Sequence, residues 1–178
     1  MAALEHDRWW DDPEWSERAI STRITGLLRI PEVSAVRYDP REQVLRIRFL
    51  VAGGVEEDQV GAAAVQLQES LEVLARLEGR QPLSLAVTGW VEAGVGTIEV
   101  VRDPATLTVG EVYLTTELLR EHFGAGLVVD PSDPYLVEEQ ALAQEEVIQA
   151  LIADLRAGRA RGPLVAIRDE GRLLVYSQ

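Results

Sequence analysis

The clearest pattern of apolar and polar positions lies in residues 43–51, where the two kinds of side chain alternate. One predicted face carries the apolar side chains of Leu45, Ile47, Phe49 and Val51. Arg46 and Arg48 fall on the other face, so we expect a strand with one buried side and one side facing solvent. Similar runs bounded by turn residues predict further strands at 33–38, 83–90, 95–102, 127–129, 164–168 and 172–177.

Four other segments repeat their apolar residues at helical spacing: 13–28, 56–78, 108–123 and 133–157. Capping residues support these boundaries: an Asp-Pro pair opens the first and last segments, Thr108 and Glu111 fit a capping box at the start of the third, and Gly79 and Gly124 follow the middle two. In the second segment the apolar stripe that we expect to be buried consists of Val60, Ala64, Leu67, Leu71, Leu74 and Leu77.

The predicted strands come mostly in pairs joined by short turns, which favours antiparallel pairing. We therefore predict an α+β fold with a largely antiparallel sheet, or sheets, and helices packed on one face. The chain divides into an N-terminal arm (1–12), an α-β-β-α-β module (13–91) and a β-α-α-β-β module (92–178). The two modules either share one core or form two.

The order of elements in residues 14–91 resembles that of small ferredoxin-like modules. One example is the cytosolic domain of cation-efflux transporters, in which a segment like Ile30-Pro31-Glu32-Val33 leads into the first strand. The resemblance implies a ferredoxin-like order of elements in the first half of the chain. The metal-binding histidines of that family have no counterpart here, so the resemblance implies no function.

The composition removes several kinds of chemistry. The chain has no lysine, no cysteine and no asparagine, and its two histidines are His6 and His122. A Schiff-base lysine, a thiolate nucleophile, a phosphate-loop lysine and a cysteine-based metal site are therefore excluded. A Gly-x-Ser-x-Gly elbow and a His-Glu-x-x-His motif are also missing from the sequence. We expect a protein without a cofactor, and more readily a non-enzyme than an enzyme.

The net charge of −13 disfavours nucleic acid and anionic membranes as partners, since both attract a positive surface. No apolar run approaches the roughly 20 residues of a membrane helix, and the N-terminus shows no signal-peptide pattern. We therefore expect a cytoplasmic protein whose partners are proteins, including copies of itself. An adaptor for a basic protein would also suit this charge.

Three tryptophans, Trp9, Trp10 and Trp15, lie within seven residues near the N-terminus. Indole rings favour burial, so this segment either folds back on its own core or inserts into a partner or a neighbouring subunit. A second candidate contact is the arginine face of the strand at 43–51, where Arg46 and Arg48 either bind an acidic partner or pair with glutamates of neighbouring elements.

Asp130, Asp133 and His122 are the candidate residues for an alternative, ligand-binding function. Two aspartates in a proline-rich loop are able to hold a cation, although Asp133 also fits a simple helix N-cap. His122 lies near the end of a predicted helix, where a histidine also complements the helix dipole.

Two functional hypotheses follow. The first is a non-catalytic assembly or protein-interaction subunit that associates with itself through the Trp-rich arm and exposed sheet edges. The alternative is a small ligand- or divalent-cation-binding domain, or a hydrolase, that uses Asp, Glu and Arg side chains.

Overall fold

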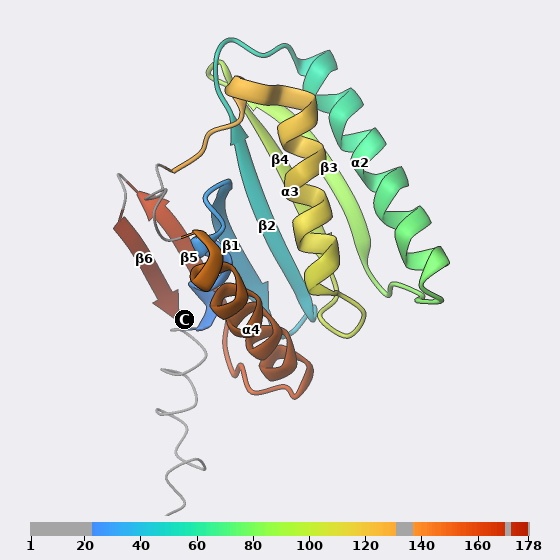
Figure 1. Cartoon of the computed structure of the whole chain (residues 1–178), viewed down its shortest axis with the longest axis vertical. Helices are drawn as coiled ribbons and strands as arrows, with labels where there is room; N and C mark the ends of the chain where they lie inside the picture. Colours follow the sequence, from blue (N-terminus) through green and yellow to red (C-terminus); the bar gives the residue numbers. More distant parts are fainter. Residues whose placement is uncertain (1–22, 131–136, 170–171, 178) are drawn as a thin grey trace, which may run out of the picture.

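Six antiparallel strands form a single sheet in the order β3-β4-β2-β1-β5-β6 (Figure 1). The computed structural model describes residues 23–130, 137–169 and 172–177. The strands are β1 (Val33–Asp39), β2 (Val44–Val51), β3 (Leu85–Glu92), β4 (Val95–Arg102), β5 (Leu164–Asp169) and β6 (Arg172–Ser177). The helices are α2 (Glu57–Leu77), α3 (Val109–Phe123) and α4 (Val137–Arg156), with the short 3-10 helices η2 (Leu27–Arg29) and η3 (Gly124–Gly126).

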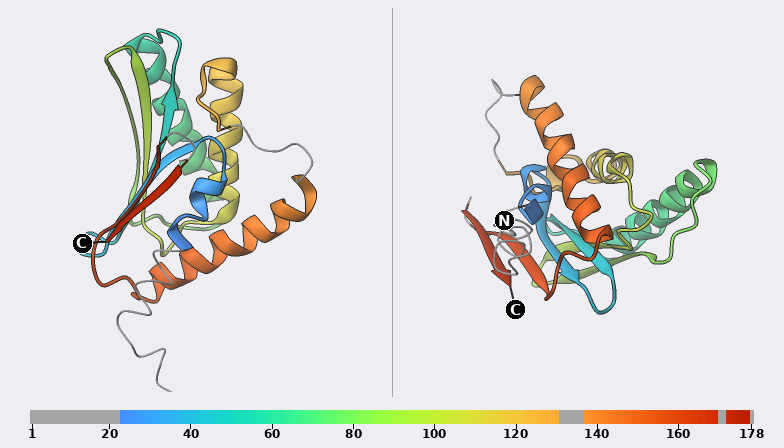
Figure 2. Two further views of the ribbon diagram at one scale, coloured as in Figure 1. Left: turned by 90° about the vertical axis from the view of Figure 1, so that its left-hand side faces the viewer. Right: turned by 90° about the horizontal axis from the view of Figure 1, so that it is seen from below.

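The helices α2, α3 and α4 all lie on one side of the sheet, as the edge-on view in Figure 2 shows. This arrangement confirms the predicted α+β class with an antiparallel sheet and helices on one face. The apolar core lies between the two layers. Its centre is formed by the apolar face of β2 predicted from the sequence, where Leu45, Ile47, Phe49 and Val51 are all buried.

The ferredoxin-like order of elements in the first half is not confirmed. β3 pairs with β4, and β4 inserts between β3 and β2, so β3 has no hydrogen-bonded contact with β1 or β2. The β3–β4 hairpin therefore returns the chain beside β2 after α2 has crossed the sheet. Strands from both halves of the sequence pair through β2–β4 and β1–β5 and share one sheet.

Most predicted boundaries agree with the structure to within two residues. Thr108 accepts a hydrogen bond from the Glu111 N–H at the start of α3, and Gly79, just after α2, has a φ of 66°. The predicted strand at 127–129 is reduced to an isolated bridge between Leu127 and Val51. The predicted burial of Leu77 is wrong: this residue ends α2 and is 80% exposed.

Gly89 in β3 allows α2 to lie close to the sheet. A Cβ at this position would lie 2.8 Å from the Val60 carbonyl oxygen of α2 and 2.7 Å from a Val60 methyl carbon. We expect Gly89→Ala to lower the free energy of unfolding by about 1–3 kcal/mol, because a backbone atom of α2 has to move. Chemical denaturation measures this loss.

Gly61, in the second turn of α2, is the matched control. A Cβ there would meet no atom within 4 Å. Gly61→Ala should raise the free energy of unfolding by up to about 1 kcal/mol, because alanine has the higher helix propensity. Equal effects of the two substitutions would show that close packing at Gly89 is unimportant.

Candidate functional site

One face of the sheet is covered by none of the described helices and is called the uncovered face. It carries a cluster of charged and aromatic side chains at its centre. Arg46 and Arg48 of β2 both reach Glu99 of β4, with N–O distances of 3.4 and 2.5 Å. Arg46 also contacts Glu42 at 3.1 Å. The guanidinium of Arg48 lies over the Trp90 ring of β3, 5.6 Å from its centre, which is a cation–π distance.

Glu99 balances much of the positive charge of this cluster. Its side chain is 9% exposed and lies between the two arginines, so the predicted basic strip is paired across the neighbouring strand. The sequence pattern did not predict Trp90 as a neighbour of this cluster. Its contact with Arg48 depends on the strand order, in which β4 lies between β3 and β2. The result is a mixed polar and aromatic surface rather than a strongly basic one.

Arginine also pairs with each buried carboxylate of the described residues. These carboxylates belong to Glu32, Glu99, Asp103, Glu111 and Asp154. Their arginine partners are respectively Arg120, Arg46 with Arg48, Arg102, Arg102 with Arg80, and Arg23 with Arg159. A carboxylate held by a guanidinium is poorly placed to bind a cation or to transfer a proton.

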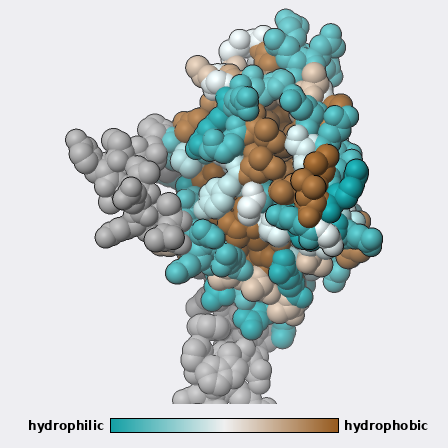
Figure 3. Space-filling model, turned by 45° about the vertical axis from the view of Figure 1, so that its right-hand side comes forward, coloured by the Kyte–Doolittle hydropathy of each residue, from teal (hydrophilic) through white to brown (hydrophobic). Residues whose placement is uncertain are grey.

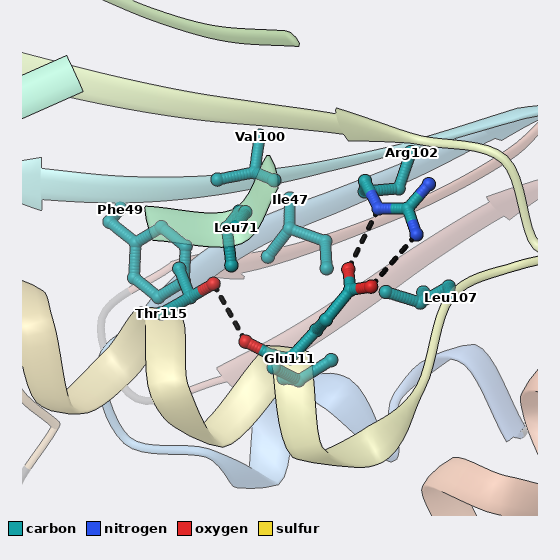
Figure 4. Close-up of a pocket in the computed structure, with 9 residues that line it drawn as sticks. Ile47, Phe49, Leu71, Val100, Arg102, Leu107, Glu111 and Thr115 are labelled. Atoms are coloured by element: carbon teal, nitrogen blue, oxygen red, sulfur yellow. Dashed lines mark hydrogen bonds and ion pairs between the residues drawn. The ribbon is translucent and has the colours of Figure 1, made fainter. Parts of the chain in front are cut away.

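The most deeply buried of these pairs joins the end of β4 to the first turn of α3. Arg102 donates two hydrogen bonds to Glu111, at 2.7 and 2.9 Å (Figure 4). It donates a third to Asp103 at 2.6 Å. Apolar side chains including Phe49 and Leu107 surround the pair and leave a cavity of about 10 Å³. Because that volume is at the lower limit for one water molecule, the cluster is a packed structural element rather than a ligand site.

Asp103 is held in its ionised form by its surroundings. Burial alone would raise the pKa of this carboxyl, but hydrogen bonds from the Ser84 N–H and from Thr106, with the charge of Arg102, outweigh burial and lower the pKa. The ionised carboxylate therefore stabilises the fold above its unfolded pKa of about 4, and this contribution is lost as the pH falls through the lower folded pKa.

The candidate ligand-binding residues do not form a common site in the described structure. The Asp130 carboxylate pairs with Arg168 of β5. His122 is exposed near the end of α3, where its ring meets that of Phe123 edge-on at 4.8 Å. Asp133 and the tryptophans Trp9, Trp10 and Trp15 lie outside the described residues. Among those residues, no three His, Asp or Glu side chains are grouped closely enough to hold a metal ion.

A groove runs between α2 and α3 on the opposite, helical side of the molecule. One hollow, of about 320 Å³, is lined by residues such as Ala63, Leu67 and Leu118, and a neighbouring hollow of about 670 Å³ shares His122 with it. Figure 3 shows apolar side chains between hydrophilic ones on this side. Because exposed Asp58 and Glu121 lie among the lining residues, the groove suits a cationic segment better than an anion.

The outer strand β6 is the other unusual surface. Its apolar side chains are exposed on both faces of the sheet: Leu173 by 45% and Val175 by 36% on the helical side, and Tyr176 by 52% on the uncovered side. The neighbouring Ile167 of β5 adds a fourth exposed apolar residue. The sequence predicts this strand, but its local pattern does not show that it lies at an edge of the sheet.

No helix among the described residues is long and apolar enough to cross a membrane. Comparison with protein-family models, with curated proteins and with solved structures found no significant match to this chain. The functional argument therefore rests on the surfaces described above.

Proposed function

We propose that this protein is a non-catalytic interaction subunit that associates with itself through one edge of its sheet, the strand β6. The Trp-rich segment that contains Trp9, Trp10 and Trp15 is the proposed second contact. The observation that carries the proposal is the outer strand β6, which combines exposed apolar side chains with an edge that no described strand pairs.

Sheet edges are usually protected, because unpaired N–H and C=O groups bind other strands. Short length, charged side chains, proline, bulges and covering helices are the common forms of protection. β6 has six residues with no proline and no described bulge, its one charged side chain is Arg172 at the first position, and the described helices leave it uncovered (Figure 1). Such an edge is a binding surface for a further strand.

The alternative, a cation- or ligand-binding domain or a hydrolase built from carboxylates, has less support. Such a site needs carboxylates that are free to accept a metal ion or a proton. The buried carboxylates of the described residues are already paired with arginine, as Glu111 and Glu99 illustrate. The larger hollows are open grooves, and among the described residues no three His, Asp or Glu side chains are grouped closely enough to hold a metal ion.

Sedimentation equilibrium of the wild-type chain and of Val175→Lys tests the proposed self-association. We expect wild-type protein to form a defined oligomer of the 19.7 kDa chain at tens of micromolar. Val175→Lys should weaken association by about 10-fold or more, because a charge on an edge strand opposes pairing. A monomeric wild type over this range would contradict the proposal.

The matched control is Val95→Lys, since Val95 is 38% exposed, nearly the same as Val175, but lies beside the β3–β4 turn. This control should leave the association constant unchanged. Deletion of residues 1–12, which removes Trp9 and Trp10, tests the N-terminal arm separately. If it leaves the oligomeric state and stability unchanged, the arm has no role in association.

A further inference from the structure

The two faces of β6 carry different sets of side chains, which follows from its register with β5. Val175 lies opposite the buried Ala166, so Val175 and Leu173 lie on the helical face. Arg172, Leu174 and Tyr176 alternate with them and lie on the uncovered face. Any strand that pairs with β6 therefore has to complement an aliphatic set on one face and an Arg-Leu-Tyr set on the other.

We propose that the strand that pairs with β6 is β6 of a second copy, in antiparallel orientation about a two-fold axis at Leu174. This inference rests on the proposed self-association and specifies its geometry. Two six-stranded sheets then become one continuous sheet. A two-fold axis perpendicular to the sheet keeps the helices of both copies on the same side, which requires residues of the same face to pair.

This register makes the strand complementary to itself. On the helical face Leu173 lies opposite Val175 of the second copy, so aliphatic side chains meet on both sides of the axis. On the uncovered face Arg172 lies opposite Tyr176 of the second copy, which places a guanidinium next to an aromatic ring twice. Leu174 meets its own copy on the axis.

The neighbouring registers that keep the faces matched are less favourable. A shift of two residues that centres the pair on Leu173 places Arg172 opposite Leu174 and loses both contacts with Tyr176. A shift of two residues in the other direction centres the pair on Val175. Arg172 then lies beyond Ser177 of the second copy, the last residue of that strand, and has no partner in it. A shift of one residue would bring opposite faces together and is excluded by the two-fold axis. The register centred on Leu174 is therefore the one that the sequence of β6 favours.

Salt should strengthen this pairing. Each copy carries a net charge of −13, so two copies repel each other at long range. The proposed contact itself is aliphatic and aromatic with backbone hydrogen bonds, and it contains no ion pair that salt would screen. An association driven by acidic and basic side chains would respond in the opposite direction.

A single introduced cysteine tests the register directly, because the chain contains no cysteine of its own. Residues directly opposite in an antiparallel pair have Cα atoms about 4.5–5.5 Å apart, within the range that a disulfide spans. Leu174→Cys should therefore form an intermolecular disulfide under mild oxidation, at least about 10-fold faster than Val95→Cys, which is exposed but remote from the axis.

A mixture of two further variants tests the same register away from the axis. Arg172→Cys and Tyr176→Cys should form a mixed disulfide with each other faster than either variant forms one with itself, because the register pairs residue 172 with residue 176. Slow cross-linking of Leu174→Cys in a chain that is oligomeric by mass would overturn the inference and leave self-association standing. A monomeric wild type would overturn both.

Discussion

Replacing Arg102 with methionine should lower the free energy of unfolding by about 3 kcal/mol. Arg102 is fully buried and its guanidinium holds both Glu111 and Asp103. Without it the two carboxylates remain in a region from which water is excluded. The expected loss is at the lower end of the range for broken buried pairs, because Arg80 still contacts Glu111 and backbone N–H groups still reach Asp103.

Urea unfolding at one fixed protein concentration, followed by circular dichroism, measures this loss. Adding Glu111→Gln to Arg102→Met should recover at least about 1 kcal/mol, since the second substitution removes a buried negative charge that Arg80 alone compensates only in part. The matched control is Glu117→Gln, which breaks the exposed pair with Arg120 and should change stability by less than about 1 kcal/mol. Equal losses in Arg102→Met and Glu117→Gln would show that burial of the Arg102 cluster does not matter.

Phe49→Ala should produce the other large loss, about 3–5 kcal/mol. Phe49 is 1% exposed on the helical face of β2, and its ring lies beside the small cavity near Arg102. Truncation removes a large apolar side chain and enlarges that cavity. The rigid sheet on one side and α3 on the other limit how far the surroundings are able to collapse.

Leu77→Ala is the control for Phe49→Ala, measured by the same unfolding experiment. Both residues belong to apolar patterns in the sequence, but Leu77 is 80% exposed. Its truncation should change the free energy of unfolding by less than about 0.5 kcal/mol. A loss above about 2 kcal/mol at Leu77, or below about 1 kcal/mol at Phe49, would contradict the burial described for these positions.

Local patterns were sufficient to predict the six strands of the sheet and the helices α2, α3 and α4. The alternation along β2 identified its buried face, and the capping residue Thr108 identified the start of α3, because both depend on neighbours close in sequence. Leu77 shows the limit of periodicity. It continues the stripe of α2, but it is the last residue of the helix and is exposed, whereas Leu71 is buried.

The order of strands could not be predicted in the same way. The insertion of β4 between β3 and β2 depends on which hairpin packs beside which strand, and a local pattern does not carry that information. The contact of Arg48 with Trp90, and the border position of β6, both follow from strand order and were therefore missed.

The buried ion pairs illustrate a second limit. Glu111 fits a capping box with Thr108, and the Thr108 hydroxyl does accept its N–H. The carboxylate, however, reaches Arg102 and Arg80 rather than completing the box. A glutamate at the third position of a helix suits both arrangements, so the sequence alone did not distinguish them.

Among the interaction candidates, Arg46 and Arg48 lie on the predicted solvent-facing side, where Glu99 partly neutralises them.

The mass of the wild-type chain in solution tests the central claim, self-association through an apolar sheet edge, most directly. Sedimentation equilibrium at about 0.1 M and about 0.5 M salt changes the screening of the −13 charge without changing the chain. We predict a mass of at least twice 19.7 kDa at tens of micromolar, with tighter association at the higher salt. A mass of 19.7 kDa at every concentration and both salt levels would contradict it.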